Sequence, residues 1–331
     1  MIRIARLLAF ALGVALIAAG VEAQAQGAYP NKPIRILIPY APGGLTDVVA
    51  RHYAEHLRKS LGQNILVENK PGASGIRAIE EMVHAKPDGY TIMVGNISTN
   101  CLTPLLLAKR MRINYDRDVQ IIARTADAPV FFLATTTNFP PKTFAEFIDY
   151  AKKNEVRYAS AGIGAYQHVN TEILAKRAGG LQLLHIPFKD GGSGILKDVA
   201  GGDTHVSWFN ITNPVGMIKA GKVRPLAVAA PQRLPAWPDV PTLDELGFSG
   251  FRPSQWNAAF APAGVPRDII DKLHDAFSAA AKTPEMQAIF EKGGMRAPTD
   301  KSADEARAWL KQEMETWRRD IEEAGIKVET E

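Results

Sequence analysis

The sequence has 331 residues, of which 46% are hydrophobic and 22% are charged, with a formal net charge of +4. These values are typical of a globular protein with enough residues for two domains. The positive charge is too small and too dispersed to favour nucleic-acid binding, and a single cysteine, Cys101, excludes an intramolecular disulfide.

The N-terminal segment has the pattern of a secretory signal peptide. Arg3 and Arg6 precede an uncharged apolar run over residues 7–21, and small residues follow it. The alternative is a membrane anchor, but the run is shorter than the roughly 20 residues that span a bilayer. We therefore predict a signal peptide over residues 1–25, cleaved after Ala23 or Ala25, and an exported mature protein.

The next segment alternates strand and helix patterns. Residues 34–38 form a continuous apolar run, and a helix with apolar residues at four-residue steps follows it and ends at Gly62. A second strand is predicted at residues 65–67, a second helix from the 71–75 turn through Val83, and a third strand at residues 90–94. This βαβαβ order predicts a parallel, doubly wound α/β sheet.

A second α/β unit begins near residue 130. Strands are predicted at residues 130–134, 157–159, 183–186, 206–209 and 224–229, and a helix at 142–153. Residues 231–253 are rich in Pro and Gly, as expected of a connection between domains. A strand at 256–261 and helices at 266–281, 284–293 and 302–325 are expected to return to the first domain. The predicted domains are residues 29–128 plus 250–331, and residues 129–249, with hinge crossings near 125–130 and 229–253.

The loop between the first strand and its helix is the first candidate site. It reads Pro-Tyr-Ala-Pro-Gly-Gly-Leu-Thr-Asp over residues 39–47, and its glycines allow the backbone to approach a ligand closely. Thr46 or Asp47 is expected to cap the helix, whose free N–H groups would then face an anion. A plain strand-to-helix connection is the alternative. Similar turns at residues 95–99, 160–165 and 190–194 also follow strands, and ligands of open α/β sheets bind beyond such strand ends.

Motifs for chemistry are weak by comparison. His52, Glu55 and His56 match the H-x-x-E-H pattern of a zinc peptidase class, but the helical period places His52 and Glu55 on the solvent face. His168 and Glu172, four residues apart, suit either a metal or an ordinary paired helix position. The glycines at 162 and 164 lack the third glycine of a dinucleotide site. We predict no catalytic residues, no metal and no cofactor.

The sequence strongly resembles the substrate-binding proteins of tripartite tricarboxylate transporters, also called Bug proteins. The resemblance covers essentially the whole mature chain. It rests on ordered motifs over residues 29–35, 39–47, 67–73, 87–91, 221–227 and 238–242.

The resemblance implies two α/β domains joined by crossover strands, with the type II periplasmic binding protein architecture. It also implies a periplasmic protein whose cleft closes on a small carboxylate and which delivers that ligand to the large and small integral-membrane subunits of a permease. The loops that hold the ligand in the family correspond to residues 41–47 and 160–168, and other segments resemble cleft-lining positions. The predicted ligand-binding residues are Tyr40, Ala41, Pro42, Gly43, Gly44, Thr46, Asp47, Ser98, Thr99, Ser160, Gly162, Gly164, Ala165, Tyr166, His168, Asp203 and Asn210.

Departures from the family pattern bear on the ligand. Ala165 stands where relatives usually carry Ser or Thr, and Tyr166 and Phe188 add aromatic surface. Helix N-termini in both units favour a dicarboxylate, and the two aromatic residues favour a flat one, such as terephthalate, unless they only pack within their domain. A monomer is expected. Two alternatives stay open: an exported zinc hydrolase using His52, Glu55 and His56, and a binding protein that serves a sensor kinase.

Overall fold

The computed structural model describes residues 29–188, 191–251 and 253–326. The predicted signal peptide therefore lies outside the described residues. Within them, nine strands join in the order β2-β1-β3-β9-β4-β7-β5-β6, and β8 also pairs with β4. No helix of the described part is long and apolar enough to cross a membrane.

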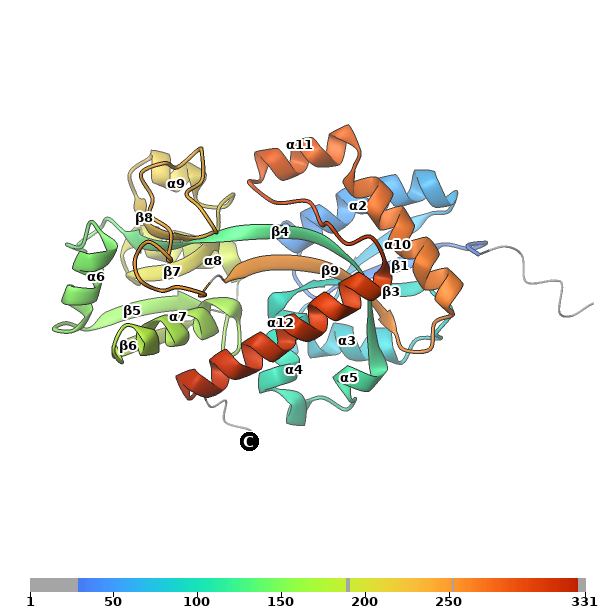
Figure 1. The fold of residues 1–331 in the computed structure, drawn as a ribbon, viewed down its shortest axis with the longest axis horizontal. Coiled ribbons are helices and arrows are strands. Elements are labelled where there is room, and N and C mark those ends of the chain that lie inside the picture. Colours follow the sequence, from blue (N-terminus) through green and yellow to red (C-terminus); the bar gives the residue numbers. More distant parts are fainter. Residues whose placement is uncertain (1–28, 189–190, 252, 327–331) are drawn as a thin grey trace, which may run out of the picture.

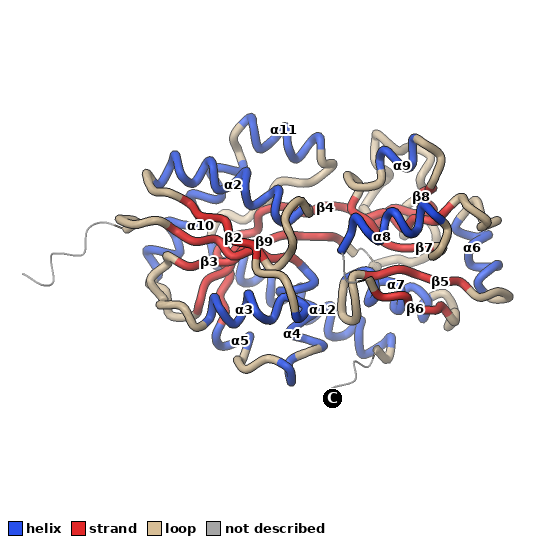
Figure 2. Tube along the Cα trace, turned by 180° about the vertical axis from the view of Figure 1, so that it is seen from behind, coloured by secondary structure: helices blue, strands red, loops and turns tan. Residues whose placement is uncertain are grey.

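The strands divide into two groups, which Figures 1 and 2 show at opposite ends of the molecule. We call the first the β1 half. It contains the parallel strands β1 (Ile34–Ile38), β2 (Ile65–Asn69) and β3 (Thr91–Asn96). We call the second the β5 half. It contains β5 (Val156–Ser160), β6 (Leu183–Pro187), β7 (Val206–Asn210) and β8 (Val223–Ala229).

Two long strands connect the halves. β4 (Val119–Thr135) pairs with β9 (Ser254–Pro262) through residue 129, and from Val130 onward it pairs with β7 and β8. The sequence predicted only residues 130–134 as strand. Residues 119–129 were missed because their pairing partner, β9, lies more than 120 positions away in the chain, which local patterning does not reveal.

Helices cover both faces of the β1 half. Ile36 and Ile38 of β1 pack with α2 (Leu45–Leu61) and α10 (Arg267–Ala281), whereas Leu37 packs with α3 (Ile76–Val83). Successive side chains of a strand point to opposite faces, so this division follows from the continuous apolar run. The doubly wound arrangement predicted for this unit is therefore present.

The region after β3 is helical, which the sequence did not predict. It consists of four short pieces: η2 (Ser98–Leu102), α4 (Thr103–Leu106), η3 (Ala108–Arg110) and α5 (Tyr115–Asp118). Another short helix, η1 (Ala73–Gly75), lies earlier in the chain, directly before α3. The β5 half carries α6 (Phe144–Ala151), α7 (Tyr166–Arg177), α8 (Gly191–Gly201) and α9 (Val215–Lys219).

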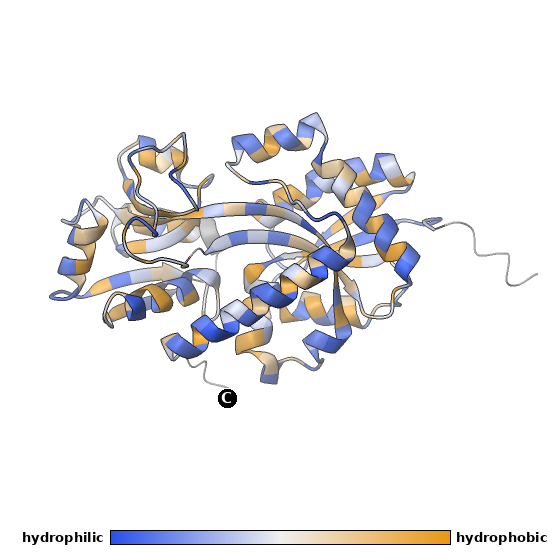
Figure 3. Cartoon of the chain, in the orientation of Figure 1, coloured by the Kyte–Doolittle hydropathy of each residue, from blue (hydrophilic) through white to orange (hydrophobic). Residues whose placement is uncertain are grey.

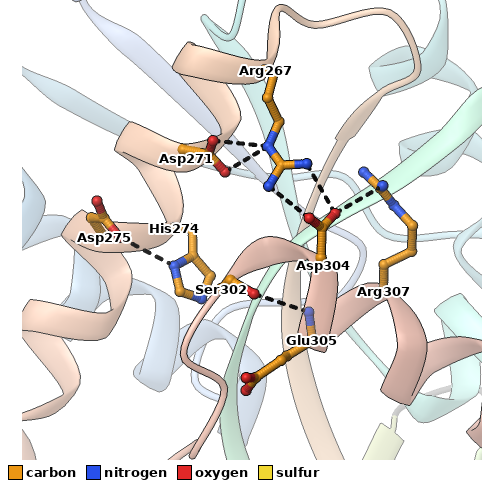
Figure 4. A network of polar contacts seen from close by, with 8 residues as sticks. All are labelled: Arg267, Asp271, His274, Asp275, Ser302, Asp304, Glu305 and Arg307. Carbon is orange, nitrogen blue, oxygen red and sulfur yellow. Dashed lines mark hydrogen bonds and ion pairs between the residues drawn. The ribbon is translucent and has the colours of Figure 1, made fainter.

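The C-terminal helices match their predicted spans closely. α11 (Pro284–Lys292) and α12 (Ala303–Ala324) have Thr283 and Ser302 as N-caps, whose hydroxyls accept the N–H groups of Met286 and Glu305. Figure 4 shows Arg267 of α10 between Asp271 and Asp304, with Nη2 of Arg267 2.8 Å from a carboxylate oxygen of Asp304. Because these groups are about half exposed, the ion pairs orient α12 more than they stabilise it.

α12 spans more of the molecule than expected. It was predicted to return to the first domain, and it does pack on β4, but it also reaches α7 of the β5 half. Arg177 of α7 donates to Asp320 of α12 at 3.0 Å. Hydrophilic and hydrophobic residues are mixed along this helix in Figure 3, and its buried residues, including Met314 and Trp317, join a core cluster that contains residues of both halves.

Candidate ligand-binding site

The 41–47 loop is held by Asp47, although not as predicted. α2 begins at Leu45 with Gly44 as its N-cap, and no side chain caps it. Thr46 and Asp47 lie within the first turn, so the expectation that one of them is the cap was wrong. Asp47 instead reaches back and accepts the N–H of Gly43 at 2.9 Å, while Gly43 has φ +90, a conformation that favours glycine.

Asp47 is buried and has several partners. Its carboxylate accepts Nε of Arg51 at 3.1 Å and Nδ2 of Asn69 at 2.8 Å. Burial by itself raises the pKa of this carboxyl, but the hydrogen bonds from Arg51, Gly43 and Asn69 outweigh it and lower the pKa below its usual value. Asp47 therefore supports the loop as a paired anion.

The start of α2 leaves backbone donors available. Its first helical hydrogen bond is donated by Val48 to Gly44 at 3.0 Å, so the N–H groups of residues 45–47 precede the helical ladder. Residues 41–44 are exposed, whereas Thr46 is buried. This is the arrangement expected of an anion site at a helix N-terminus.

Beneath the loop lies a group of buried amide and hydroxyl side chains. Thr46 donates to Oδ1 of Asn257 at 2.7 Å, and Nδ2 of Asn96 donates to Thr46 at 3.1 Å. Tyr40 donates to Oδ1 of Asn96 at 2.5 Å and lies 3.3 Å from the hydroxyl of Thr99. The residues predicted from the sequence did not include Asn96 and Asn257. A partial signal was available, because Asn96 directly follows the apolar residues 92–94 and Gly95, and Asn257 is the one polar residue within the predicted strand 256–261.

The second loop, residues 160–165, leads from β5 to α7. Ala165 is the N-cap of α7 and supplies no side-chain cap. The first helical bond of α7 is donated by Val169 to Ala165 at 3.1 Å, so the N–H groups of Tyr166, Gln167 and His168 precede it. Because Ala165 has no hydroxyl, unlike the Ser or Thr expected at this position from the family resemblance, the N–H groups at the start of α7 are not capped by residue 165.

Stacked rings support the second loop from below. The imidazoles of His168 and His185 lie 4.4 Å apart between centroids, and Tyr158 stacks on His185 at 4.9 Å. Nδ1 of His168 accepts the N–H of Gly164 at 3.3 Å, and Nε2 of His185 lies 2.5 Å from Oγ of Ser160. Burial lowers the pKa of each imidazole to about 4, so both are neutral at pH 7.

Two residues considered for a metal, His168 and Glu172, take part in these contacts. His168 bonds the loop, and Glu172 accepts the hydroxyl of Tyr158 at 2.5 Å. Both side chains thus have hydrogen-bond partners within the β5 half, as expected of ordinary paired helix positions. Ser160 also accepts the N–H of Gly162 at 3.0 Å, so it closes its own turn.

The two loops are connected through Ser98. Its backbone N–H donates to Oδ1 of Asn96 at 2.9 Å, and its hydroxyl accepts the N–H of Tyr166 at 3.2 Å. The first contact lies in the β1 half and the second reaches the start of α7 in the β5 half. The structure thus brings together the predicted residues of 40–47, 98–99 and 160–168.

Tyr166 and Phe188, the two aromatic departures, both pack inside the β5 half. Tyr166 is 6% exposed, and its hydroxyl donates to the carbonyl oxygen of Trp208 at 3.1 Å. Phe188 is half-buried against a core cluster that includes Phe131 and Ile195. Their packing is explained without a ligand, which weakens the argument for a flat aromatic one.

Two predicted residues at β7 have different positions. Asn210 ends this strand and donates Nδ2 to Oε1 of Gln255 at 2.9 Å, which ties β7 to β9 near the loops. Asp203 precedes the strand and is exposed at its opposite end. Asp203 was predicted as a cleft-lining residue, but the five-residue strand β7, roughly 17 Å long, separates it from Asn210 and the loops. We therefore exclude Asp203 from the candidate site.

The H-x-x-E-H residues lie on the outer face of α2. His52 and Glu55 are exposed, as the helical period predicted, and Glu55 pairs with Arg58 at 3.3 Å. Nε2 of His56 lies 3.5 Å from the hydroxyl of Thr283. The described residues contain no group of three or more His, Cys, Asp or Glu side chains placed to hold a metal. The zinc-hydrolase alternative thus has no geometric support in the described part.

Two open surface cavities lie elsewhere. One, of about 440 Å³, borders α6 and β6, and another, of about 400 Å³, borders η1, α3 and η3. Neither is lined by a predicted ligand-binding residue.

The fold is that of periplasmic binding proteins: two α/β halves joined by long crossover strands, with strand-end loops of the two halves linked through Ser98. The family model for the tripartite tricarboxylate transporter family receptor matches residues 49–326. The chain belongs to this family.

Individual proteins show the same likeness. The protein BugT of Bordetella pertussis is 30% identical over 330 residues, 98% of each chain. The structure of the periplasmic binding protein BugD has a TM-score of 0.79 and 32% identity, over 90% of this chain and 99% of that one. MatC of Rhodopseudomonas palustris, solved with bound malate, has a TM-score of 0.80 and 31% identity, over 88% of this chain and all of that one.

Proposed function

We propose that this protein is a periplasmic solute-binding protein that captures a small dicarboxylate between its two halves. The observation that carries the proposal is the pair of helix N-termini, of α2 and α7, that lack side-chain caps and are linked through Ser98. Each leaves backbone donors for one carboxylate group. Malate, which MatC binds, is a dicarboxylate.

The chemistry of the site suits an anion held by neutral donors. The predicted site residues include no Lys or Arg, and Asp47, which supports the first loop, already has its own partners. Backbone N–H groups and amides can hold a carboxylate without a counter-ion, because hydrogen bonds to a charged acceptor are stronger than neutral ones. Ligand affinity should therefore depend only modestly on salt.

Closure in this proposal is a movement of two domains, residues 29–128 with 250–331 and residues 129–249. β4 pairs with β9 through residue 129 and with β7 from residue 130 onward. This change of pairing partner supports hinge crossings near 125–130 and 229–253. Membership of the receptor family supports delivery to the large and small membrane subunits of a tripartite tricarboxylate-type transporter. A sensor kinase as the recipient is the alternative, and a pull-down with each partner distinguishes them.

A ligand panel tests the proposal directly. Malate, citrate, terephthalate, benzoate and aspartate are added to purified protein, and the melting temperature is measured. A ligand at 100 times its Kd stabilises the folded state by about 2.7 kcal/mol. With an unfolding entropy of about 2.1 cal/mol/K per residue, this raises the melting temperature by roughly 4 °C for a chain of this size. We expect the dicarboxylates to give the largest shifts. A shift with terephthalate alone would restore the aromatic ligand, and no shift with any carboxylate would reject the proposed function.

A further inference from the structure

The hydrogen bonds beneath the 41–47 loop have a fixed direction. A backbone N–H can only donate, so the bond from Ser98 identifies the accepting atom of Asn96 as its oxygen. The other atom of this amide is then Nδ2, which donates to the hydroxyl of Thr46. The hydroxyl of Thr46 donates in turn to Oδ1 of Asn257.

With these directions fixed, the Nδ2 group of Asn257 is left as a donor at the end of the hydrogen-bond chain. Asn257 is 0% exposed, and its Nδ2 has no hydrogen-bond partner within the described part of the chain. The opposite orientation of the Asn257 amide, rotated by 180°, is unfavourable. Its Nδ2 would then face the hydroxyl of Thr46, which already accepts from Nδ2 of Asn96, and the Thr46 proton would lose its acceptor. A buried donor without a partner is costly, so this position calls for an acceptor or an ordered water.

The position of Asn257 places this donor beside the candidate site. Asn257 is paired in register with Asn96, at the end of β3. Gln255, two residues earlier on β9, lies on the same face and bonds Asn210 of β7. Trp256 points to the opposite face, where its Nε1 donates to Glu313 of α12 at 2.9 Å. One face of this crossover strand therefore contacts the start of α2 through Asn257 and the end of β7 through Gln255.

We propose that Asn257 donates its Nδ2 hydrogen to a carboxylate oxygen of the bound ligand, and that Thr46 and Asn96 orient this amide. The inference rests on the proposed function and adds to it a ligand contact on β9, the strand that joins the two halves. Asn257 is the binding residue, and Thr46 is a positioning residue. The ligand atom at this point must be an acceptor, which excludes an ammonium or amide N–H group from it.

Substitutions at Asn257 test the contact, with malate and terephthalate as the probes. Asn257→Asp keeps the oxygen that accepts from Thr46 and replaces the donor by an acceptor. We expect it to weaken carboxylate binding by at least ~100-fold in calorimetry, and Asn257→Ala by ~10- to 100-fold, as for a lost hydrogen bond to a charged group. Thr125→Val is the matched control, because Thr125 is also 0% exposed on a crossover strand and its hydroxyl has no partner in the described residues. Its Kd should be unchanged.

A pair of variants at Thr46 separates orientation from packing. Thr46→Ser keeps the hydroxyl and should bind within ~2-fold of the wild type, whereas Thr46→Val keeps the shape, loses the donor and should bind ~10-fold more weakly. If Asn257→Asp fails to fold, spectra of protein labelled with ¹⁵N-asparagine decide the matter. The side-chain amide resonance absent from Asn257→Ala should move when malate or terephthalate is added to the wild type.

The outcomes are distinct. If the wild type binds a carboxylate, but the Asn257 and Thr46→Val variants bind as tightly as Thr125→Val, the contact is wrong and the proposed function stands. An unmoved amide resonance under saturating ligand also rejects the contact, since a buried water then occupies the donor. If the wild type binds no carboxylate, both proposals fail.

Discussion

The 41–47 loop and the 160–165 loop have the same backbone design with different supports. Each follows a parallel strand and precedes a helix without a side-chain cap. The first is held by a carboxylate, Asp47, and the second by the stacked imidazoles of His168 and His185. Equivalent anion-facing backbones can thus depend on a carboxylate that loses its charge on protonation or on imidazoles that gain one, so the two loops should respond differently to mutation and to pH.

The largest expected effect is a block of the first loop. Gly44 has φ −76, and a Cβ placed there would meet nothing within 4 Å, so Gly44→Val should fold normally. Its side chain would cover the N–H groups at the start of α2, and we expect at least ~100-fold weaker carboxylate binding by calorimetry, with little change in melting temperature. Gly216→Val is the control, since Gly216 lies in α9 and also has open space around it. Equal affinities for the two variants would remove the first loop from the site.

Asp47→Asn should separate support from binding. The amide of the variant keeps one acceptor oxygen, but its NH₂ group must face another donor, either Arg51 or the N–H of Gly43. We therefore expect the free energy of unfolding to fall by about 1–3 kcal/mol and ligand binding to weaken ~10-fold. Because the folded-state pKa of Asp47 is lowered, its contribution is present above the unfolded value near 4 and is lost as the pH falls below it. Denaturant titrations from pH 7 to pH 3 measure this. Asp149→Asn, at an exposed position of α6, should match the wild type, and the same result for Asp47→Asn would contradict the role of this carboxylate.

The second loop should weaken at a higher pH than the first. His168 and His185 have folded-state pKa values of about 4, below the unfolded value near 6.5. The unfolded chain therefore binds more protons between these values, and stability should decline as the pH falls from about 6.5 to about 4.

A variant of His168 isolates this effect. His168→Asn offers an oxygen in place of Nδ1 as acceptor for the N–H of Gly164 and cannot be protonated in this range. It should flatten the decline in both stability and ligand affinity, whereas His52→Asn, at an exposed position of α2, should not. An unchanged pH profile for His168→Asn would show that the stacked imidazoles do not support the loop.

The smallest effect is expected at the contact between the loops. Ser98→Ala removes the acceptor that binds the N–H of Tyr166 and so frees this N–H for a ligand. Because a net hydrogen bond contributes about 0.5–1.5 kcal/mol, we expect carboxylate affinity to rise by roughly 2- to 10-fold. Ser60→Ala, at the far end of α2, is the control. Weaker binding by Ser98→Ala would mean that the hydroxyl itself contacts the ligand, as predicted from the sequence.

Local patterns were sufficient for the strongly periodic elements and for the two loops. The apolar run of β1, the four-residue steps of α2 and the Ser302 and Gly325 boundaries of α12 are properties of neighbouring residues, which explains why their predicted spans are close to the observed ones. The glycine-rich turns after β1 and β5 were likewise visible, because tight turns require particular residue types.

Tertiary structure decided what surrounds those loops. Asn96 and Asn257 lie far apart in the chain and acquire their meaning only when β3 pairs with β9. The same holds for the 119–129 part of β4, for the stack of His168 on His185, and for Asp203, which a strand carries away from the site. The sequence by itself determined the strongly periodic helices and strands and the residue types of the strand-end turns. Long-range strand pairing decided which buried donors and acceptors meet, since their partners are distant in the chain and near only in the folded protein.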